Sequence, residues 1–261
     1  MVQENLTDHI IFVGDVHAGS RCAPWPSDMR SEFGTGVVSE YLADCFSDFT
    51  SRMPAGSTLV LNGDLVDGPQ RKSGGMGLFT PVLSQQVDAA ISLIGPLAKK
   101  ASRIYRIVGT PYHDDDHGPL SAFDRALGVH SVRQVFNFRL GESILNVAHH
   151  PGGGSTLYTG TKSSREMMKA TVAAARRKIP GVRWIVRSHL HHWNLHHEEG
   201  MTYMGLPCWQ MPTPWAVKGD YFGWQPAIGA AEMFRDDQEP GGWRFRPHLY
   251  EVPQEEVECI G

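Results

Sequence analysis

Carboxylate and imidazole side chains recur in four short segments of this chain, each directly after an apolar run that is typical of a β-strand. The segments are Gly14-Asp15-Val16-His17, Gly63-Asp64-Leu65-Val66-Asp67-Gly68, His149-His150-Pro151 and Ser188-His189-Leu190-His191. Carboxylates and neutral imidazoles are the ligand types that suit manganese, iron and zinc. One such segment alone is usually only a turn, but a turn does not predict the accompanying histidines. Four in series predict that strands deliver metal ligands to a common edge.

Strands and helices alternate along the part of the chain that carries these segments. Apolar runs that indicate buried strands cover residues 9–13, 57–61, 103–108, 143–148 and 182–186. Apolar residues recur at helical spacing between them, as Leu83, Val87, Ala90, Ile91 and Ile94 and again as Met168, Val172, Ala175 and Ile179. Strand followed by helix, repeated, predicts an α/β fold whose functional residues follow the carboxyl ends of strands.

The final third of the chain is different, with short runs broken by glycine and proline, and we expect further strands and loops there. Without a long linker or internal repeat, the sequence predicts one domain over residues 1–261. Its core would cover about residues 9–195, with strands and loops at 196–255 completing it. The tryptophans of this third, Trp209 among them, favour packing roles over stacking on a substrate ring.

Bulk composition narrows the class of protein. Hydrophobic residues make up 41% of the 261, enough for a substantial core, and the four cysteines form no CxxC pair. The net charge of -4 gives no support to an extended nucleic-acid partner. A nucleotide substrate is still compatible with this charge, because bound metal ions would supply local positive charge. The polar first eight residues and the lack of a ~20-residue apolar stretch predict a cytoplasmic protein without membrane contact.

The ordered set of segments resembles the calcineurin-like metallophosphoesterases over roughly residues 9–195: Gly-Asp-x-His, Gly-Asp-x-x-Asp-Gly, a histidine after a strand, and Ser-His-x-His. The resemblance implies a four-layer sandwich of two mixed β-sheets flanked by α-helices. It also implies two metal ions, drawn from manganese, iron and zinc with manganese favoured. Asp15, His17 and His191 would hold one ion, His149 and His189 the other, and Asp64 would bridge them. His149 is chosen over His150 because it matches the family's His-x-Pro pattern.

The chain departs from the family at its third motif, normally Gly-Asn-His followed by an acid. Here the sequence reads Gly109-Thr110-Pro111-Tyr112-His113-Asp114, so threonine replaces the asparagine ligand and proline replaces the histidine. His113 lies two residues further on and is the candidate general acid or missing ligand, against the alternative of a plain loop histidine. Asp67 is either a partner that orients a catalytic histidine or a loop cap.

These features together predict a binuclear phosphoesterase in which a metal-bound hydroxide attacks phosphorus of a small phosphate ester or nucleotide. A phosphodiester is favoured, because the protein phosphatases place arginine after the second aspartate where this chain has Gly68. The alternatives are a phosphomonoesterase and a scaffold that keeps the fold but has lost catalysis. The altered Thr110-Pro111 segment motivates the scaffold hypothesis. The sequence leaves the oligomeric state open.

Overall fold

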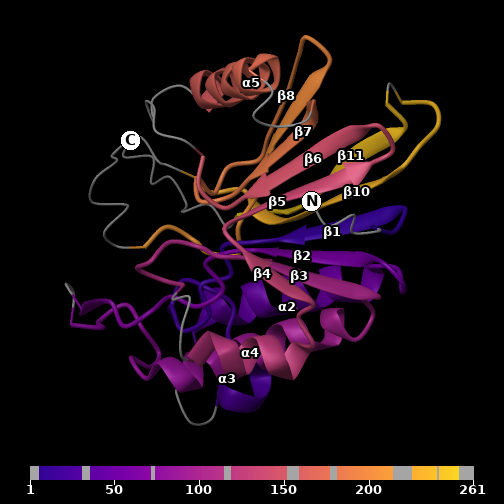
Figure 1. Cartoon of the computed structure of the whole chain (residues 1–261). Helices are drawn as coiled ribbons and strands as arrows, with labels where there is room; N and C mark the ends of the chain where they lie inside the picture. The colour runs from indigo at the N-terminus through magenta and orange to yellow at the C-terminus, as the bar shows by residue number, and fades with distance from the viewer. Residues whose placement is uncertain are drawn as a thin grey trace, which may run out of the picture.

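The chain folds into four layers in a computed structural model that describes residues 6–30, 36–71, 74–114, 119–151, 159–176, 181–213, 225–239 and 241–252. Two β-sheets stack face to face at the centre (Figure 1). Helix α5 (Thr159–Ala175) covers the outer face of one sheet. The outer face of the other sheet is covered by α2 (Val37–Arg52), α3 (Leu83–Ala98) and α4 (Pro119–Leu127).

The first sheet has the order β11-β10-β1-β2-β3-β4 within the described residues. Its strands β1 to β4 are parallel, and β10 and β11 join antiparallel beside β1. Strand β2 is buried along its whole length, as expected for a parallel strand covered on both faces. The strands are β1 (His9–Val13), β2 (Thr58–Asn62), β3 (Arg103–Ile107), β4 (Ser131–Arg133), β10 (Ile228–Arg235) and β11 (Trp243–Tyr250).

The second sheet has the order β5-β6-β7-β9-β8, again for the described residues. Strands β6, β7 and β9 are parallel, whereas β5 and β8 are antiparallel edge strands. Buried and exposed residues alternate along β5, because one face of this edge strand meets the core and the other meets solvent. The strands are β5 (Val135–Leu140), β6 (Ser143–Ala148), β7 (Val182–Arg187), β8 (Asn194–Glu198) and β9 (Met201–Gly205).

The sandwich is held by apolar layers between the sheets and beneath the helices. Phe12, Val147 and Trp184 belong to the core between the two sheets. Helices α2 and α3 pack against the first sheet through a second core that includes Phe46 and Ile94. A short 3-10 helix, η1 (Ser27–Met29), precedes α2.

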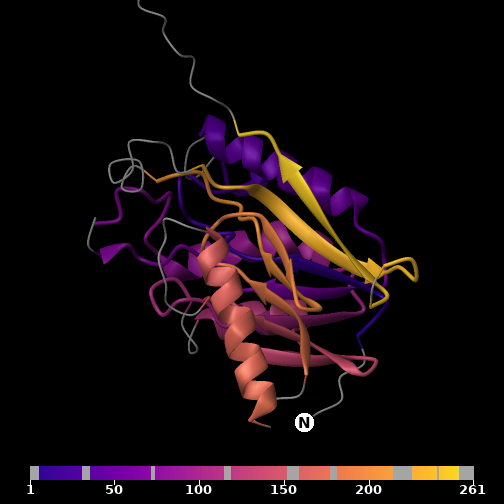
Figure 2. The ribbon, with the colours of Figure 1, turned by 90° about the horizontal axis from the view of Figure 1, so that it is seen from above.

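The prediction for the buried face of α5 is wrong. Met168 and Val172 are 69% and 43% exposed, whereas Met167 is buried against the second sheet with Ile185 and Tyr203. Figure 2 shows α5 crossing the outer face of that sheet. Two adjacent methionines lie about 100° apart on a helix, so apolar spacing alone did not determine which of them faces inward.

The predicted α/β fold of two mixed sheets flanked by helices is confirmed. All five predicted strands are present within one residue at each end, and α3 begins at Leu83 within its predicted region. The final third supplies β8 and β9 to one sheet and β10 and β11 to the other. The single-domain boundaries stay a prediction.

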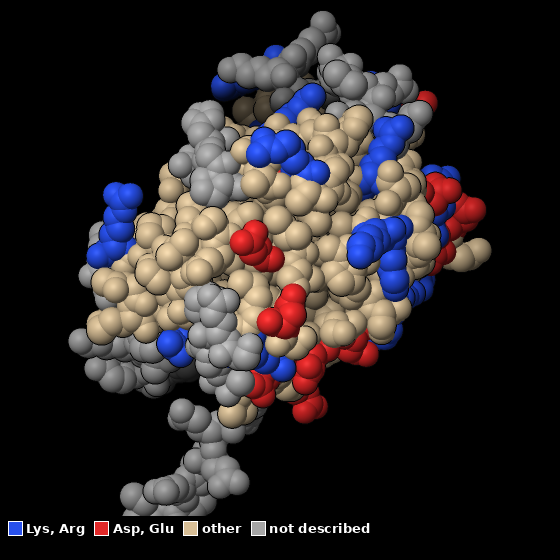
Figure 3. Space-filling view, turned by 90° about the horizontal axis from the view of Figure 1, so that it is seen from below, with Lys and Arg blue, Asp and Glu red and all other residues tan. Residues whose placement is uncertain are grey.

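No helix in the described residues is long and apolar enough to cross a membrane. On the face that lies below in Figure 1, which α3 and α4 cover, lysine and arginine side chains are dispersed among acidic and uncharged residues (Figure 3). The described residues of this face therefore form no continuous basic patch.

Candidate metal centre

The residues predicted as metal ligands all follow the carboxyl ends of strands and lie together where the two sheets meet. Asp15 and His17 follow β1, Asp64 follows β2, and His149 follows β6. The remaining pair, His189 and His191, follow β7. Hydrogen bonds join neighbouring loops within each sheet: Asp15 N–H donates to Gly63 O at 3.0 Å, and Ser188 N–H donates to His149 O at 2.9 Å. Asn62 Nδ2 donates to Ser188 Oγ at 2.6 Å and joins the two sheets.

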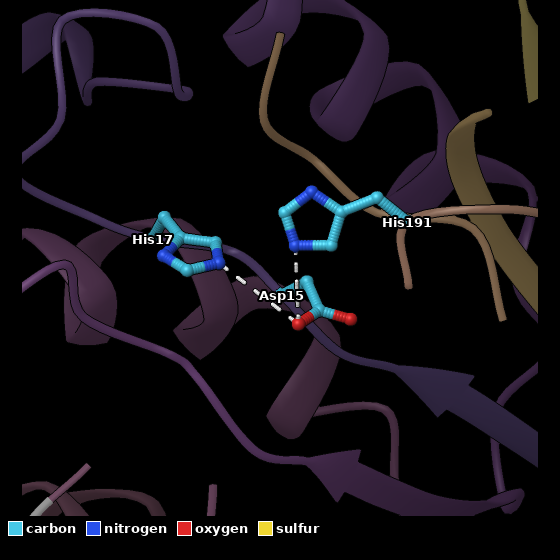
Figure 4. A group of neighbouring side chains, drawn as sticks. All are labelled: Asp15, His17 and His191. Carbon is cyan, nitrogen blue, oxygen red and sulfur yellow. Dashed lines mark ion pairs between the residues drawn. The ribbon is translucent and has the colours of Figure 1, made fainter. Parts of the chain in front are cut away.

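The first cluster consists of Asp15, His17 and His191 (Figure 4). Asp15 Oδ1 lies 3.4 Å from His191 Nε2 and 3.9 Å from His17 Nε2, and both rings point toward that oxygen. The other carboxylate oxygen, Oδ2, accepts the backbone N–H of His189 at 2.9 Å. One oxygen therefore fixes the orientation of the carboxylate, and the other faces the histidines.

The second cluster consists of Asp64, His149 and His189. His149 Nε2 lies 3.1 Å from Asp64 Oδ2 and 3.9 Å from Asp15 Oδ1. His149 Nδ1 donates to the backbone oxygen of Asn62 at 2.7 Å, which leaves Nε2 as the ring atom that faces the carboxylates. Asp15 Oδ1 thus faces histidines of both clusters, while the bridging role of Asp64 stays a prediction.

Buried atoms that form no hydrogen bond among the described residues include Asp15 Oδ1, His17 Nε2 and His149 Nε2, the last of which has only its ion-pair contact with Asp64 Oδ2 at 3.1 Å. Leaving a polar atom buried and unpaired costs about 1–3 kcal/mol, and native proteins seldom do so without an ion, a water or a catalytic reason. A carboxylate oxygen that faces an imidazole nitrogen of each cluster offers the donor types that divalent cations take. The residues present fit a metal centre.

The backbone at this site is held in an uncommon conformation. Seven non-glycine residues of the described chain have positive φ, and five of them are candidate ligands: Asp15, His17, Asp64, His189 and His191, with φ between 49° and 71°. Each such residue costs of order 1–3 kcal/mol and persists only where the surroundings enforce it. The strain therefore coincides with the predicted ligands and supports a functional site.

Two glycines permit the close packing around Asp64. A Cβ at Gly63, which has φ of +81°, would lie 2.6 Å from His149 Nδ1. A Cβ at Gly109 would lie 2.2 Å from Asp64 Oδ1. Glycine at both positions lets backbone approach the second cluster where any side chain would displace it.

Asp67 supports the first cluster through its side chain. Its Oδ1 lies 3.1 Å from His17 Nδ1 and accepts a hydrogen bond from Gln210 Nε2 at 3.0 Å. A carboxylate at Nδ1 keeps the proton there and turns Nε2 toward the cation, as ligating histidines require. The interpretation of Asp67 as an orienting residue therefore agrees with the structure, but the oriented ring is His17. Sequence reasoning missed Gln210, which is 143 positions away and stands in no recognisable motif.

His113 lies beside the first cluster. Its ring contacts that of His17 edge to face, with centroids 4.6 Å apart, and its Nδ1 donates to the backbone oxygen of Asp67 at 2.6 Å. Burial and the neighbouring His17 lower the pKa of His113. The ring is thus fixed through Nδ1 with Nε2 left for other contacts, and its role as acid or ligand stays a prediction.

Thr110, which stands where the resemblance would place asparagine, contacts Asp64 directly. Its backbone N–H and its hydroxyl donate to Asp64 Oδ1 at 2.7 and 3.1 Å. The loop itself is held by Asp114, whose Oδ2 accepts the Gly109 N–H at 2.7 Å while Oδ1 pairs with buried Arg106 at 3.1 Å. Burial raises the pKa of Asp114 to about 6 although Arg106 opposes the rise.

Opposite charges dominate the electrostatics of the two clusters. Burial raises the pKa values of Asp15 and Asp64, but the facing histidines outweigh it and lower both. Burial disfavours charged His149, yet Asp15 and Asp64 raise its pKa to about 9. Burial, together with His149 and His150, lowers the pKa of His189 to about 4. Each carboxylate is therefore kept ionised, the state that binds a cation.

His150 lies outside both clusters. Its ring centroid is 4.3 Å from that of His189, so the two rings pack against each other. The preference for His149 over His150 as the inward residue is consistent with this arrangement.

No family model and no curated protein matches the chain. Solved structures that resemble it include Vps29 from Entamoeba histolytica complexed with Zn²⁺, which is 11% identical, has a TM-score of 0.43, and covers 92% of this chain and 98% of that one. A novel archaeal phosphodiesterase is 9% identical with a TM-score of 0.47, covering 93% and 99%. Yfce, a phosphoesterase from E. coli, is 12% identical with a TM-score of 0.44, covering 87% and 89%. Because these TM-scores are below 0.5, the functional conclusion rests on the site itself.

Proposed function

We propose that this protein is a metal-dependent phosphoesterase with two cation positions, one in each cluster. The observation that carries the proposal is that buried Asp15 Oδ1 has no hydrogen-bond partner among the described residues and lies 3.9 Å from both His17 Nε2 and His149 Nε2, which belong to different clusters. The residue types and their order in the chain are those of the calcineurin-like metallophosphoesterases. Manganese, iron or zinc would suit these donors, and manganese is the first choice for a test.

Bound cations would lower the pKa of water and neutralise charge on the phosphate oxygens. The chain's own residues prepare this chemistry by fixing proton positions. Asp67 holds a proton on His17 Nδ1, and the backbone oxygen of Asn62 holds one on His149 Nδ1. His113, anchored through its Nδ1, would donate a proton from Nε2 to the departing alkoxide when its ring is protonated.

A phosphodiester is the favoured substrate. Position 68 has φ of +77°, and a Cβ there would lie 2.6 Å from the backbone oxygen of Tyr112. Arginine therefore does not fit where the protein phosphatases have one, and no cation at that position is available for the extra charge of a monoester. A phosphomonoesterase is the second candidate.

A catalytically impaired scaffold is the alternative from another class. Its support is Thr110, which donates hydrogen bonds to Asp64 instead of offering an amide oxygen to a cation. The strained ligand backbone argues against it, because a scaffold gains nothing from holding five aspartate and histidine residues at positive φ.

Metal counting combined with hydrolysis assays tests the proposal. The protein is stripped with a chelator, reloaded with Mn²⁺ and assayed with bis(p-nitrophenyl) phosphate and p-nitrophenyl phosphate. We expect up to two equivalents of metal and metal-dependent hydrolysis with the diester preferred. Metal binding without hydrolysis of either ester would favour the scaffold, and the absence of both would contradict the proposal.

A further inference from the structure

A cavity of about 490 Å³ opens beside the second cluster. It lies between the loop after β3 and the adjoining ends of β5 and β6, and its lining includes Thr110, Val135 and His149. Thr110 contacts Asp64, and His149 belongs to the cluster itself. A molecule whose phosphate occupied the metal centre would therefore extend directly into this cavity. Its volume falls within the range of small-molecule sites.

The walls of the cavity are chiefly apolar. Val108, Pro111, Val135 and Ala148 supply aliphatic surface, and the amide of Gln134 supplies a donor and an acceptor at the exposed side. Among the described residues of the lining there is no lysine or arginine. Such walls favour an uncharged group with a few hydrogen-bonding atoms.

The carboxylate of the lining disfavours a second anion. Asp114 is fully engaged, because its oxygens bind Arg106 and the Gly109 N–H at 3.1 and 2.7 Å. Arg106 balances the charge of Asp114, and the carboxylate has no hydrogen-bond donor to offer a ligand. A polyphosphate or a second phosphate group would therefore find no lysine, arginine or free donor among the described residues of the lining to replace its hydration.

We infer that this cavity binds the uncharged, ring-sized organic group of the ester, such as a nucleoside, while the phosphate lies between the two clusters. The inference rests on the proposed function and names its substrate class. It makes Val135 and Gln134 specificity-determining residues. Neither contacts the metal centre, and Val135 is 46% exposed, so both tolerate substitution without loss of the fold.

The test compares two diesters with the same leaving group, thymidine 5′-(p-nitrophenyl phosphate) and methyl p-nitrophenyl phosphate, on the Mn²⁺-loaded full chain. We expect the thymidine ester to have a KM lower by about tenfold or more. Val135→Arg, which places a long cation in the cavity, should raise that KM to the value for the methyl ester. Gln134→Ala should raise the thymidine KM about threefold.

Val172→Arg on α5 is the matched control, because Val172 is 43% exposed and lies outside the cavity lining. It should leave both KM values unchanged. Equal KM values for the two esters, or a thymidine KM that Val135→Arg does not move, would overturn the inference while leaving the proposed function intact.

If neither ester is hydrolysed, the proposed function fails, and ligand binding alone then tests whether the cavity holds an organic group. Calorimetry then compares thymidine 5′-monophosphate with inorganic phosphate on the metal-loaded protein. Tighter binding of the nucleotide, lost in Val135→Arg, would support the cavity as an organic-group site. Equal affinities would overturn it.

Discussion

Two buried groups of acids and histidines flank the same strand, β1. Each contains a histidine nitrogen without a hydrogen bond, but they differ in whether the central carboxylate has both oxygens engaged. Beside the start of β1, Glu232 is 2% exposed and binds His9 Nε2 at 2.5 Å, Arg246 Nη1 at 3.0 Å and His248 Nε2 at 3.2 Å. After the end of β1, Asp15 Oδ1 has no hydrogen-bond partner and faces histidines at 3.4 to 3.9 Å.

This difference in the carboxylate oxygens distinguishes a structural ion-pair cluster, around Glu232, from a candidate metal site, around Asp15, that is made of the same residue types. In the Glu232 group both carboxylate oxygens are engaged, and none of its members has positive φ. In the metal centre, hydrogen bonds engage the outer atoms, as at His17 Nδ1 and His149 Nδ1, and leave the inner atoms for another partner. Composition does not distinguish the two groups, whereas the buried carboxylate oxygen without a hydrogen bond, Asp15 Oδ1, does.

Asp64→Asn is expected to give the largest effect. Removing the charged oxygen that faces His149 should abolish hydrolysis, by more than about a hundredfold, and remove at least one equivalent of metal. Elemental analysis measures the metal content, and a diester assay measures the turnover. Glu232→Gln is the matched control and should retain both; an Asp64→Asn protein with normal turnover would refute the metal centre.

Asp67→Asn should have the next largest effect. Without the carboxylate at Nδ1, His17 loses the group that fixes its tautomer, and metal affinity should fall about 10–100-fold. Calorimetric titration of the stripped protein with Mn²⁺ measures the loss. Asp124→Asn, which weakens only the exposed side of the Arg106 ion pair, serves as the control. Unchanged affinity would mean that Asp67 is a loop cap.

Thr110→Asn should have a smaller effect of opposite sign. The substitution adds an amide oxygen beside Asp64, where the adjoining cavity provides room, and should raise the affinity for one metal equivalent by about tenfold. The same titration resolves the two equivalents. If both affinities fall, then the Thr110 hydroxyl is needed to hold Asp64.

Glu232→Gln should leave metal binding unchanged and alter stability alone. Burial raises the pKa of Glu232, but His248 and His9 outweigh it and lower that pKa from 4.5 to about 2. A lowered folded pKa contributes stability above pH 4.5, which is lost as the pH falls toward 2. Urea unfolding should show the variant about 1–3 kcal/mol less stable at pH 7, and the gap should close near pH 2. A gap independent of pH would contradict this role.

The sequence predicted the strands and the residues that follow them because both are local features. An apolar run followed by Gly-Asp or His-His requires only a few neighbouring residues, and the structure brings Asp15, Asp64 and His149 together from such segments. Local sequence patterns do not predict how the strands divide between two sheets, and only the family resemblance implied this division. It depends on pairings between distant segments, such as β1 with β10.

Other features of the site required the folded chain. The side chain of Asp67 contacts His17 and its backbone oxygen contacts His113, and Gln210 donates a hydrogen bond to Asp67. These contacts join loops that are far apart in sequence. The cavity beside Thr110 combines the ends of three strands and has no signature in any one of them. The inward face of α5 was mispredicted because apolar residues occupy adjacent positions, Met167 and Met168.

The positive φ angles at the candidate ligands should lower the thermal stability of the metal-free protein. Glycine adopts positive φ at little steric cost, so His191→Gly or Asp15→Gly would relax the main chain while deleting a donor. These two glycine variants are therefore expected to lose turnover but to have a higher Tm than the cation-free parent protein. At these five positions glycine would give the more stable backbone, whereas aspartate and histidine provide the groups that bind a cation. The residues present there therefore favour activity over stability.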